Sequence, residues 1–426
     1  MYPELPESVR FPRLTVQGRS LLYRMRQHPH APLWNWPNGE QLDDEGLARV
    51  QEFSRGLNNP SRRERMEKPD WLDGFVEKCL QDVPFYRSRS RVGTTFESLP
   101  TCDRSDLAPK VWAFVPDSEP LDSLVVFSSS GTTGHPTKTP HHPFSAACGV
   151  PLMEFALKEF CGHRLLYGSD HVAITNVAAY PGAFTTAIVV SYLNEAGCVR
   201  VNLDPSAWRN EGDRERYLDE WKSPVWLGDP VAFAAMEKLD LRHPPQAIFS
   251  SILQLSDAYR EKLSSRYGCP VLDVYAMTEA GIIAVGSGSG HRILPHDLYV
   301  EILDDRGEPC ELGERGEITL TGGRNPFLPL LRYRTGDFAS LAFVDGFRTL
   351  VGFEGRMPVE YTTSWGTTVH SMQLTRLMRE HPVVRYEMLG SVGNYQLRIW
   401  GDCDRALLQK EIVALFGNQV AIEYQT

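Results

Sequence analysis

Residues 171–203 read HVAITNVAAYPGAFTTAIVVSYLNEAGCVRVNL, and this stretch of the sequence decides the fold. Two short runs rich in β-forming residues, HVAITNV at 171–177 and CVRVNL at 198–203, lie on either side of a longer run. That run, TTAIVVSYLNEAG at 185–197, is compatible with a helix. Strand, helix and strand in succession are typical of parallel βα units. The stretch therefore predicts an α/β fold with a parallel sheet.

The same alternation extends in both directions. Upstream, the strand-like SLVVFSSS at 123–130 precedes a helix-like run at 144–160. Downstream, the strand-like runs SPVWLGDP, QAIFSS and PVLDVYAMTE are separated by helix-like runs at 230–240 and 257–268. We therefore expect the βα units to continue to the change in composition near Gly286.

Beyond Gly286 the sequence favours antiparallel strands. The segment GSGSG leads into the runs DLYVEILDDRGEPC, ERGEITLTGG and DFASLAFVDGFRTLVGFEG, with Arg-Gly and Asp-Gly at the bends. Such turn dipeptides between apolar runs predict hairpins. We predict an N-terminal extension at 1–70, a large domain at 71–355 with a β-rich subdomain at about 286–355, and a small α+β domain at 356–426.

The composition excludes several classes of protein. Of the 426 residues 42% are hydrophobic and 23% are charged, and no apolar run approaches the roughly 20 residues of a membrane span. The formal charge of -10 argues against a nucleic-acid partner. The N-terminus lacks the apolar core of a signal peptide, so we expect a cytoplasmic protein without a membrane partner. The eight cysteines are scattered singly, which predicts neither disulfides nor a structural metal.

The stretch VVFSSSGTTGHPTKTPHH, at 125–142, is rich in hydroxyls and glycines. Backbone N–H groups of a glycine-rich loop, helped by Ser and Thr hydroxyls, can converge on a phosphate. The stretch lacks the GxxxxGK[ST] pattern of a Walker loop. It can equally be a solvent-exposed loop, although the strand-like run before it and the helix-like run after it favour phosphate binding.

Two further motifs carry groups that suit a nucleotide. In DVYAMTEAG, at 273–281, an exposed Tyr275 could stack on a base, Thr278 could bond a phosphate and Glu279 could hold Mg2+. The alternative is a core tyrosine beside a solvated glutamate. In LLRYRTGDFASL, Asp337 could accept ribose hydroxyls, or it could serve a hairpin turn.

Taken in order, SSSGTTGHPT, YAMTE, RYRTGD and the Gly-Arg pair ending at Arg356 resemble the core motifs of the acyl-adenylate-forming, AMP-binding superfamily. Most branches of the superfamily carry Lys at the position of Thr137. A Thr there resembles the phenylacetate-coenzyme A ligase branch. The segments VPFYRSR, FESLPTCDRSDL and GHRILPHDLYVEILDDRGEP resemble that branch as well. The likeness runs from about Trp71 to the C-terminus. It implies a large adenylating domain followed by a small C-terminal domain.

The resemblance also implies roles for single residues. The hydroxyl-rich loop would wrap the β- and γ-phosphates of ATP, Thr278 would contact the α-phosphate, Glu279 would hold Mg2+, and Arg356 would contact the ribose or phosphate at the domain hinge. Tyr275 would contact adenine and Asp337 the ribose. The loop residues are Ser129, Ser130, Gly131, Thr132, Thr133 and Gly134. The candidates for the acid pocket are Tyr180, Gly182, Phe184, Ala276 and Gly281, with core packing as the alternative for the two aromatic residues.

Several positions depart from the family pattern. Ala276 stands where the family usually has Gly, and FSSILQLSD lacks the usual Glu-Pro pair. Pro358 stands at the hinge and restricts the backbone there. The family's glycine-lysine loop has no counterpart, and the last lysine, Lys410, falls in a helix-like run, so we assign no catalytic lysine and expect a shortened C-terminal domain. His135, His141 and His142 flank the phosphate loop and either supply a compensating donor or have a solvated or structural role.

Three functions follow from the resemblance. The first is ATP- and Mg2+-dependent activation of a small, aromatic carboxylic acid as acyl-AMP, with transfer of the acyl group to coenzyme A. The second keeps adenylation but transfers the acyl group to a carrier-protein thiol or an amine. The third is a nucleotide-binding relative without catalysis. The sequence does not decide the oligomeric state and leaves a homodimer open.

Overall fold

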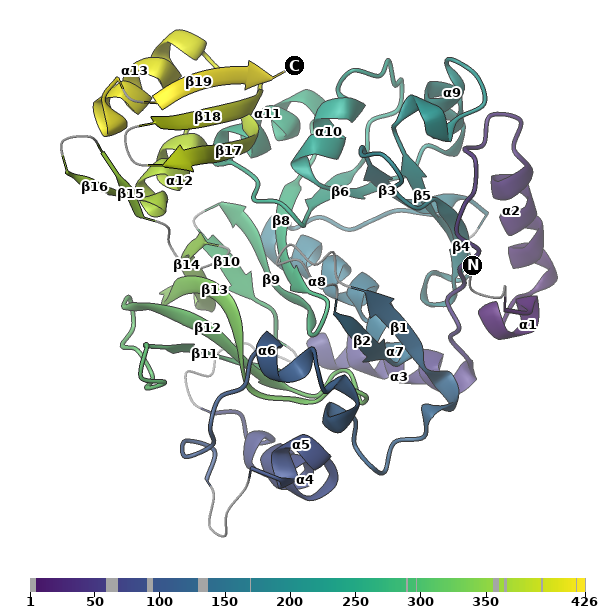
Figure 1. The fold of residues 1–426 in the computed structure, drawn as a ribbon. Coiled ribbons are helices and arrows are strands. Elements are labelled where there is room, and N and C mark those ends of the chain that lie inside the picture. Colours follow the sequence, from purple (N-terminus) through teal and green to yellow (C-terminus); the bar gives the residue numbers. More distant parts are fainter. Residues whose placement is uncertain are drawn as a thin grey trace.

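The computed structural model describes residues 5–58, 68–89, 95–128, 137–168, 170–288, 290–295, 297–354, 360–363, 366–391, 394–418 and 420–425. Within these residues a mixed sheet of twelve strands forms the centre of the molecule (Figure 1). Its strands, in spatial order, are β11 (Leu298–Leu303), β12 (Arg315–Gly322), β13 (Leu330–Val344), β14 (Phe347–Glu354), β10 (Gly290–Ile293), β9 (Gly281–Gly288), β8 (Val271–Met277), β7 (Ala247–Ser250), β6 (Val225–Gly228), β3 (Val172–Ala178), β5 (Ala196–Asn202) and β4 (Thr186–Val190).

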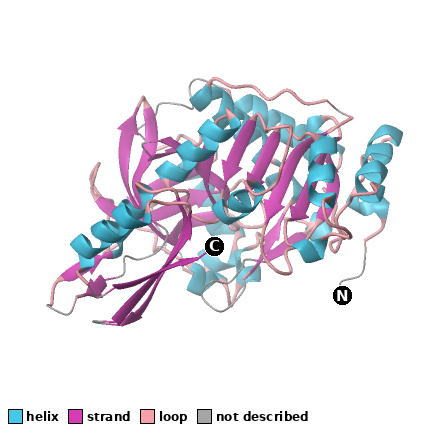
Figure 2. Cartoon of the chain, turned by 90° about the horizontal axis from the view of Figure 1, so that it is seen from above, coloured by secondary structure: helices cyan, strands magenta, loops and turns pink. Residues whose placement is uncertain are grey.

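Strands β8, β7, β6, β3 and β5 run parallel, as the sequence predicts. Helices flank these strands on both sides (Figure 2). Successive side chains of a strand point to opposite faces, so that Ile248 joins one apolar cluster while Ala247 and Phe249 join another. One cluster lies under α10 (Pro230–Met236) and α11 (Asp257–Tyr267), and the other under α7 (Pro143–Ala147) and α8 (Gly149–Cys161). The α/β class is confirmed.

The prediction of a helix at 185–197 is wrong. Residues 186–190 form β4, which pairs antiparallel with β5, and Ser191–Leu193 make a single 3-10 turn between them. The run TAIVV is rich in β-branched residues, which pack well on a sheet, and a short apolar run does not distinguish helix from strand by its pattern. Asn194 and Glu195 adopt positive φ angles of 53° and 61°, so the chain reverses there.

Strands β9 to β14 are antiparallel and continue the same sheet. The hairpin β13–β14 turns at Asp345 and Gly346, both with positive φ, which confirms the turn expected from the Asp-Gly pair. A second hairpin, β1 (Val125–Ser128) with β2 (Lys138–His141), lies apart from this sheet. Helices α3 (Asp44–Leu57), α4 (Leu72–Asp82), α5 (Pro84–Arg87) and α6 (Arg104–Leu107) are among those that precede it in the chain, and α9 (Asp213–Trp221) follows β5.

The N-terminal residues contribute to the core of the large sheet. In the sequence Leu47, Val50 and Phe53 recur at the spacing of one helix face and predict a helix from Asp43 to Arg55, which α3 confirms. Helices α1 (Glu7–Arg10) and α2 (Val16–Gln27) were not predicted. Leu21, Leu22 and Met25 of α2 are buried in the cluster that also holds β3 and β5. Figure 1 shows α1 and α2 beside β4, at the edge of the sheet.

Residues 360–425 carry an apolar cluster of their own. They form β15 (Glu360–Thr362), β16 (Thr368–His370), α12 (Ser371–Arg379), β17 (Val383–Ser391), β18 (Asn394–Gly401), α13 (Arg405–Phe416) and β19 (Val420–Gln425). Leu374, Leu397 and Ile412 are fully buried between these elements. The mixed α+β character expected for this part is confirmed. None of the described helices is both long and apolar enough to cross a membrane.

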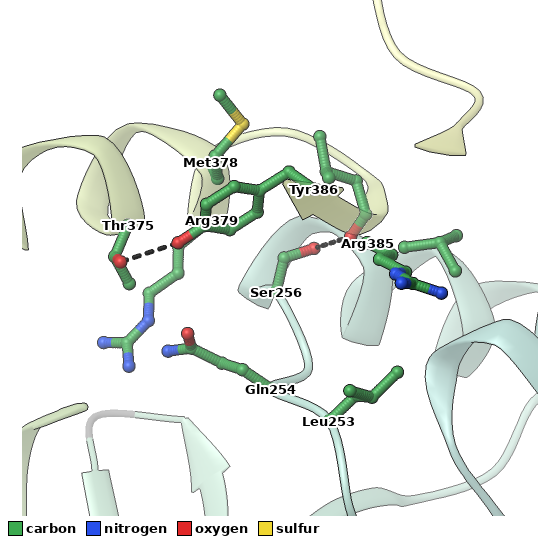
Figure 3. Close-up of a pocket in the computed structure, with 10 residues that line it drawn as sticks. Leu253, Gln254, Ser256, Thr375, Met378, Arg379, Arg385 and Tyr386 are labelled. Atoms are coloured by element: carbon green, nitrogen blue, oxygen red, sulfur yellow. Dashed lines mark hydrogen bonds between the residues drawn. The ribbon is translucent and has the colours of Figure 1, made fainter. Parts of the chain in front are cut away.

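The contact of these residues with the rest of the chain combines apolar packing and hydrogen bonds. Val384 is buried in the cluster beneath α10 and α11. The Ser256 hydroxyl, at the start of α11, donates to the carbonyls of His381 (2.9 Å) and Val383 (3.0 Å). Arg379 donates to the carbonyl of Phe353 at the end of β14 (2.7 Å). Ser256 and Arg379 line a small cavity of about 180 Å3 at this contact (Figure 3).

Candidate active site

A cavity of about 400 Å3 lies where β8 ends and β9 begins. β8 ends at Met277, residues 278–280 form a turn, and β9 returns antiparallel from Gly281. Ligands of α/β sheets bind outside the carboxyl ends of the strands, and this turn lies at such an end. The cavity is lined by Phe127, His141, Ser145, Ala146, Gly149, Ala276, Met277, Thr278, Glu279, Ala280, Gly281, Ile282, Arg324 and Asn325.

Two residues predicted to bind the nucleotide, Tyr275 and Asp337, come from distant motifs and meet next to this turn. The Tyr275 hydroxyl donates to Oδ2 of Asp337 at 2.9 Å. The expectation that Tyr275 is exposed is wrong, because its side chain is 6% exposed and its ring lies 4.5 Å from that of Phe353. Burial, reinforced by the Asp337 carboxylate, holds the pKa of Tyr275 well above its usual value, so the hydroxyl stays a donor. The adenine and ribose roles of the pair stay predictions.

Glu279 is buried rather than solvated. Its side chain is 5% exposed, and the Tyr333 hydroxyl donates to Oε1 at 3.4 Å. Among the described residues no three His, Cys, Asp or Glu side chains gather to form a metal cage. Mg2+ bound to a nucleotide needs only one or two protein carboxylates, because phosphates and waters supply the other ligands. A single buried carboxylate at the cavity wall fits that requirement.

The hairpin β1–β2 brings together the two ends of the hydroxyl-rich loop. Ser128 pairs with Lys138 in this hairpin, and Val125 pairs with His141. The predicted phosphate-loop residues Ser129, Ser130, Gly131, Thr132, Thr133 and Gly134 lie outside the described residues, as do His135 and the predicted hinge residues Arg356 and Pro358. Their roles stay predictions.

His141 joins this hairpin to the turn after β8. Its Nδ1 lies 3.4 Å from the Asn325 amide nitrogen, its Nε2 lies 3.2 Å from the Thr139 hydroxyl, and it hydrogen-bonds the backbone of Thr278. Burial lowers its pKa to about 4, so the imidazole is neutral at neutral pH. His142 has a structural role instead, because its Nδ1 accepts from the backbone N–H of Phe144 and caps α7.

The five candidates for the acid pocket divide into two groups. Ala276 and Gly281 line the cavity, together with Thr278 and Glu279. Tyr180, Gly182 and Phe184 follow β3 instead and are not among the lining residues; Tyr180 is 46% and Phe184 40% exposed, so core packing does not describe them. Strands β7 and β6 lie between β8 and β3. The three strand spacings therefore separate β8 from β3 by about 14 Å, at roughly 4.8 Å each. Their substrate role stays a prediction.

The sequence analysis misses Arg324 and Asn325, which follow β12. The Asn325 amide donates to the carbonyl of Pro140 (2.8 Å), and its Oδ1 accepts from the backbone N–H of His142 (3.3 Å). Arg324 lies against the start of β9, where its Nη2 donates to the carbonyl of Ile282 (3.3 Å). The sequence signal was a run of polar and breaker residues, GGRNP, directly after a strand-like run.

Comparison with known proteins supports the resemblance. The profile of the AMP-binding enzyme family matches residues 90–325, which is more than half of the chain. Phenylacetate-coenzyme A ligase from Escherichia coli (strain K12) is 23% identical over 354 residues, 77% of either chain. Chalcone synthase cfoA from Aspergillus candidus is 25% identical over 238 residues, 49% of this chain and 8% of that protein, so this chain spans a small part of that relative.

A solved structure has the same fold. 2-Hydroxyisobutyryl-CoA ligase, in the postadenylation state with 2-HIB-AMP, superposes with a TM-score of 0.61 at 16% identity, covering 86% of this chain and 88% of that one. The recognition from four ordered motifs is confirmed by the family match. The chain belongs to the AMP-binding enzyme family, and with it to the adenylate-forming ligases.

Proposed function

We propose that the protein uses ATP and Mg2+ to activate a small, aromatic carboxylic acid as an acyl-AMP, and then transfers the acyl group to coenzyme A. The observation that carries the proposal is the meeting of two distant motifs: Tyr275 bonds Asp337 directly beside a cavity that Thr278 and Glu279 line. The name of the E. coli relative, phenylacetate-coenzyme A ligase, supports an aromatic acid and coenzyme A as acceptor.

The chemistry requires mainly positioning and charge neutralisation. A carboxylate oxygen attacks the α-phosphorus of ATP and pyrophosphate leaves; the acceptor thiol then attacks the acyl carbon and AMP leaves. Thr278 would contact the α-phosphate, and Glu279 would hold Mg2+, which neutralises charge on the phosphates. Ser129 to Gly134 and Arg356 would complete the phosphate and hinge contacts. We also propose that residues 71–355 and 356–426 act as the two domains of this reaction.

The proposal is tested by acid-dependent release of pyrophosphate. The protein is incubated with ATP, Mg2+, hydroxylamine and a panel of aromatic and aliphatic acids. Glu279→Gln should lower kcat by about a hundredfold or more, because it removes the carboxylate that would hold Mg2+. Glu154→Gln is the matched control: Glu154 also accepts from a tyrosine hydroxyl, that of Tyr167, but outside the cavity.

Two results would contradict the proposal. Absence of pyrophosphate release with every acid, despite ATP binding in calorimetry, would favour a nucleotide-binding protein without catalysis. If mass spectrometry finds acyl transfer to a carrier-protein thiol or to an amine and none to coenzyme A, the proposed acceptor is wrong, whereas the proposed adenylation still stands.

A further inference from the structure

Strand β13 has a bulge at the motif that carries Asp337. Between two paired positions, β13 has three residues, 335–337, where β12 has only Ile318. Bulges of this kind interrupt the ladder of hydrogen bonds and redirect the side chains, and they are common next to active sites. Asp337 is the last of the three residues, and its carboxylate accepts from the Tyr275 hydroxyl at 2.9 Å. The bulge therefore determines where this carboxylate lies.

The side chain of Glu317 binds the backbone of this bulge. Glu317 lies on β12 next to Ile318, and it is buried. Its Oε1 accepts from the backbone N–H of Gly336 at 2.8 Å. An N–H inside a bulge lies outside the regular ladder, and a buried backbone N–H needs an acceptor. The Glu317 carboxylate supplies that acceptor.

The second oxygen of Glu317 is held by Arg334, the residue just before the bulge. Oε2 accepts from Nε of Arg334 at 2.6 Å and lies 2.5 Å from Nη2. Hydrogen bonds between two charged groups are short and strong. The backbone of Arg334 is bonded as well, because its N–H donates to the carbonyl of Cys102 at 2.7 Å. Glu317 therefore ties the middle of the bulge to a residue that is itself held in place.

Thr335 holds the bulge from within. Its hydroxyl donates to the carbonyl of Ile318 at 2.9 Å and accepts from the backbone N–H of Asp337 at 3.1 Å. It also hydrogen-bonds the Tyr275 side chain. Gly336, the next residue, has a φ of 80°, a conformation that glycine adopts at little cost. These bonds fix the conformation of the chain that leads into Asp337.

We propose that Glu317 is a positioning residue: through the bulge it holds Asp337 where the ribose hydroxyls of ATP would lie, and it thereby sets the preference of the site for a ribonucleotide. This inference rests on the proposed function and on the predicted contact of Asp337 with the ribose. Glu317 is not among the described residues that line the cavity, so its effect on the nucleotide is indirect. Hydrogen bonds weaken steeply with distance and angle, so a small shift of the bulge is enough to weaken the ribose contact.

The test measures nucleotide binding and turnover in Glu317→Gln. An amide offers one acceptor and one donor in place of two acceptors, so either the Gly336 N–H or the Arg334 guanidinium loses its partner. The Kd of ATP with Mg2+, measured by calorimetry, and the KM for ATP should both rise about tenfold, the size expected for a hydrogen bond to a charged group. The kcat should change much less. The preference for ATP over 2′-deoxyATP and 3′-deoxyATP should shrink in the variant.

A double variant shows whether Glu317 acts through Asp337. Asp337→Asn should weaken ATP binding at least as strongly as Glu317→Gln does. Adding Glu317→Gln to Asp337→Asn should then weaken binding little further, because the carboxylate that Glu317 positions is already gone. If the two factors multiply instead, Glu317 acts on ATP independently of Asp337, and the inference is overturned.

Further variants separate positioning from folding. Glu301, on β11, is also buried and forms an ion pair with an arginine of β13, Arg332, at 3.5 Å, but it lies outside the bulge. Glu301→Gln is the matched control and should leave the Kd of ATP unchanged. If Glu317→Gln fails to fold, Thr335→Val, which removes the hydroxyl that holds the bulge, takes its place. It should weaken ATP binding, and Thr335→Ser should restore it; equal binding by both variants overturns the inference.

The outcomes separate this inference from the proposed function. An unchanged Kd of ATP in Glu317→Gln overturns the role of Glu317 and leaves adenylation standing. A lower kcat with an unchanged KM for ATP also overturns it, because Glu317 would then act on the reaction rather than on the ribose contact. If no acid releases pyrophosphate, adenylation fails, and the calorimetric comparison of ATP with its deoxy forms alone then supports or overturns the inference.

Discussion

His141 shows how burial of one residue makes stability depend on pH. Its pKa is about 4 in the folded protein, against an ordinary value of 6.5, mainly because burial disfavours the imidazolium. Between pH 6.5 and 4 the unfolded chain therefore binds a proton at this site that the folded chain does not. The folded state loses stability as the pH falls through this window, and the loss is complete below about pH 4.

The corresponding prediction compares His141→Gln with the unaltered protein. The free energy of unfolding of the unaltered protein should fall between pH 7 and pH 4.5 by about 2–3 kcal/mol more than that of the variant. Urea denaturation at the two pH values measures the difference. Parallel pH dependence of both proteins would mean that His141 is protonated in the folded state.

At the same scale, the sequence singled out some of the residues at the cavity and missed others for a physical reason. Tyr275, Glu279 and Asp337 were predicted because each lies in a short motif with a recognisable order; Glu279 lines the cavity and Tyr275 bonds Asp337 beside it. Arg324 has no such motif, because its place at the cavity depends on the path of the loop between β12 and β13 past the start of β9. The exposure of Tyr275 was misjudged because its hydroxyl partner, Asp337, is 62 positions away in the chain.

At the scale of elements, the turn from β8 into β9 depends on a single glycine. Gly281 has a φ of 71°, a conformation that costs other residues about 1–2 kcal/mol. A Cβ there would lie 3.4 Å from Nη1 of Arg324, which is ordinary van der Waals contact, so the cost comes from the backbone conformation. Gly281→Ala should therefore lower the free energy of unfolding by about 1–2 kcal/mol, measured by chemical denaturation.

Gly288, at the other end of the same strand, is the matched control. A Cβ at Gly288 would meet no atom within 4 Å, and its φ lies outside the left-handed region. Gly288→Ala should be neutral or stabilise the protein by a few tenths of a kcal/mol. Equal losses in the two variants would show that the strand, rather than the conformation at Gly281, resists the substitution.

The elements themselves were predictable where their pattern was long or had clear ends. Helix α3 and the hairpin β13–β14 were predicted because amphipathic spacing and an Asp-Gly turn mark them. β4 was mistaken for a helix because its apolar run is buried on both faces and therefore does not alternate. Helix α2 was missed because the helix contains Gly18 and many polar residues. These make the apolar stripe of Leu21, Leu22 and Met25 hard to recognise in the sequence.

At the scale of the whole molecule, one hydroxyl joins residues 360–425 to the chain that precedes them. Ser256 caps α11 by accepting from the backbone N–H of Tyr259, and it donates to the carbonyls of His381 and Val383. Val384 is buried next to these bonds, in the cluster beneath α10 and α11. The division into domains at residues 355 and 356 stays a prediction, but Ser256 would cross it.

Ser256→Ala should therefore loosen the contact as well as the helix. The lost cap and the lost bonds to the two carbonyls together should lower the free energy of unfolding by about 1–3 kcal/mol. Hydrogen exchange of the backbone amides of β17 should become faster, because this strand begins at Val383. Ser264→Ala, in the same helix, removes a hydroxyl whose bond to the Cys269 carbonyl is local, and should leave β17 unchanged. Unaltered exchange in β17 of Ser256→Ala would mean that the remaining contacts, among them the apolar packing around Val384 and the bond from Arg379 to the Phe353 carbonyl, are enough to hold residues 360–425 in place.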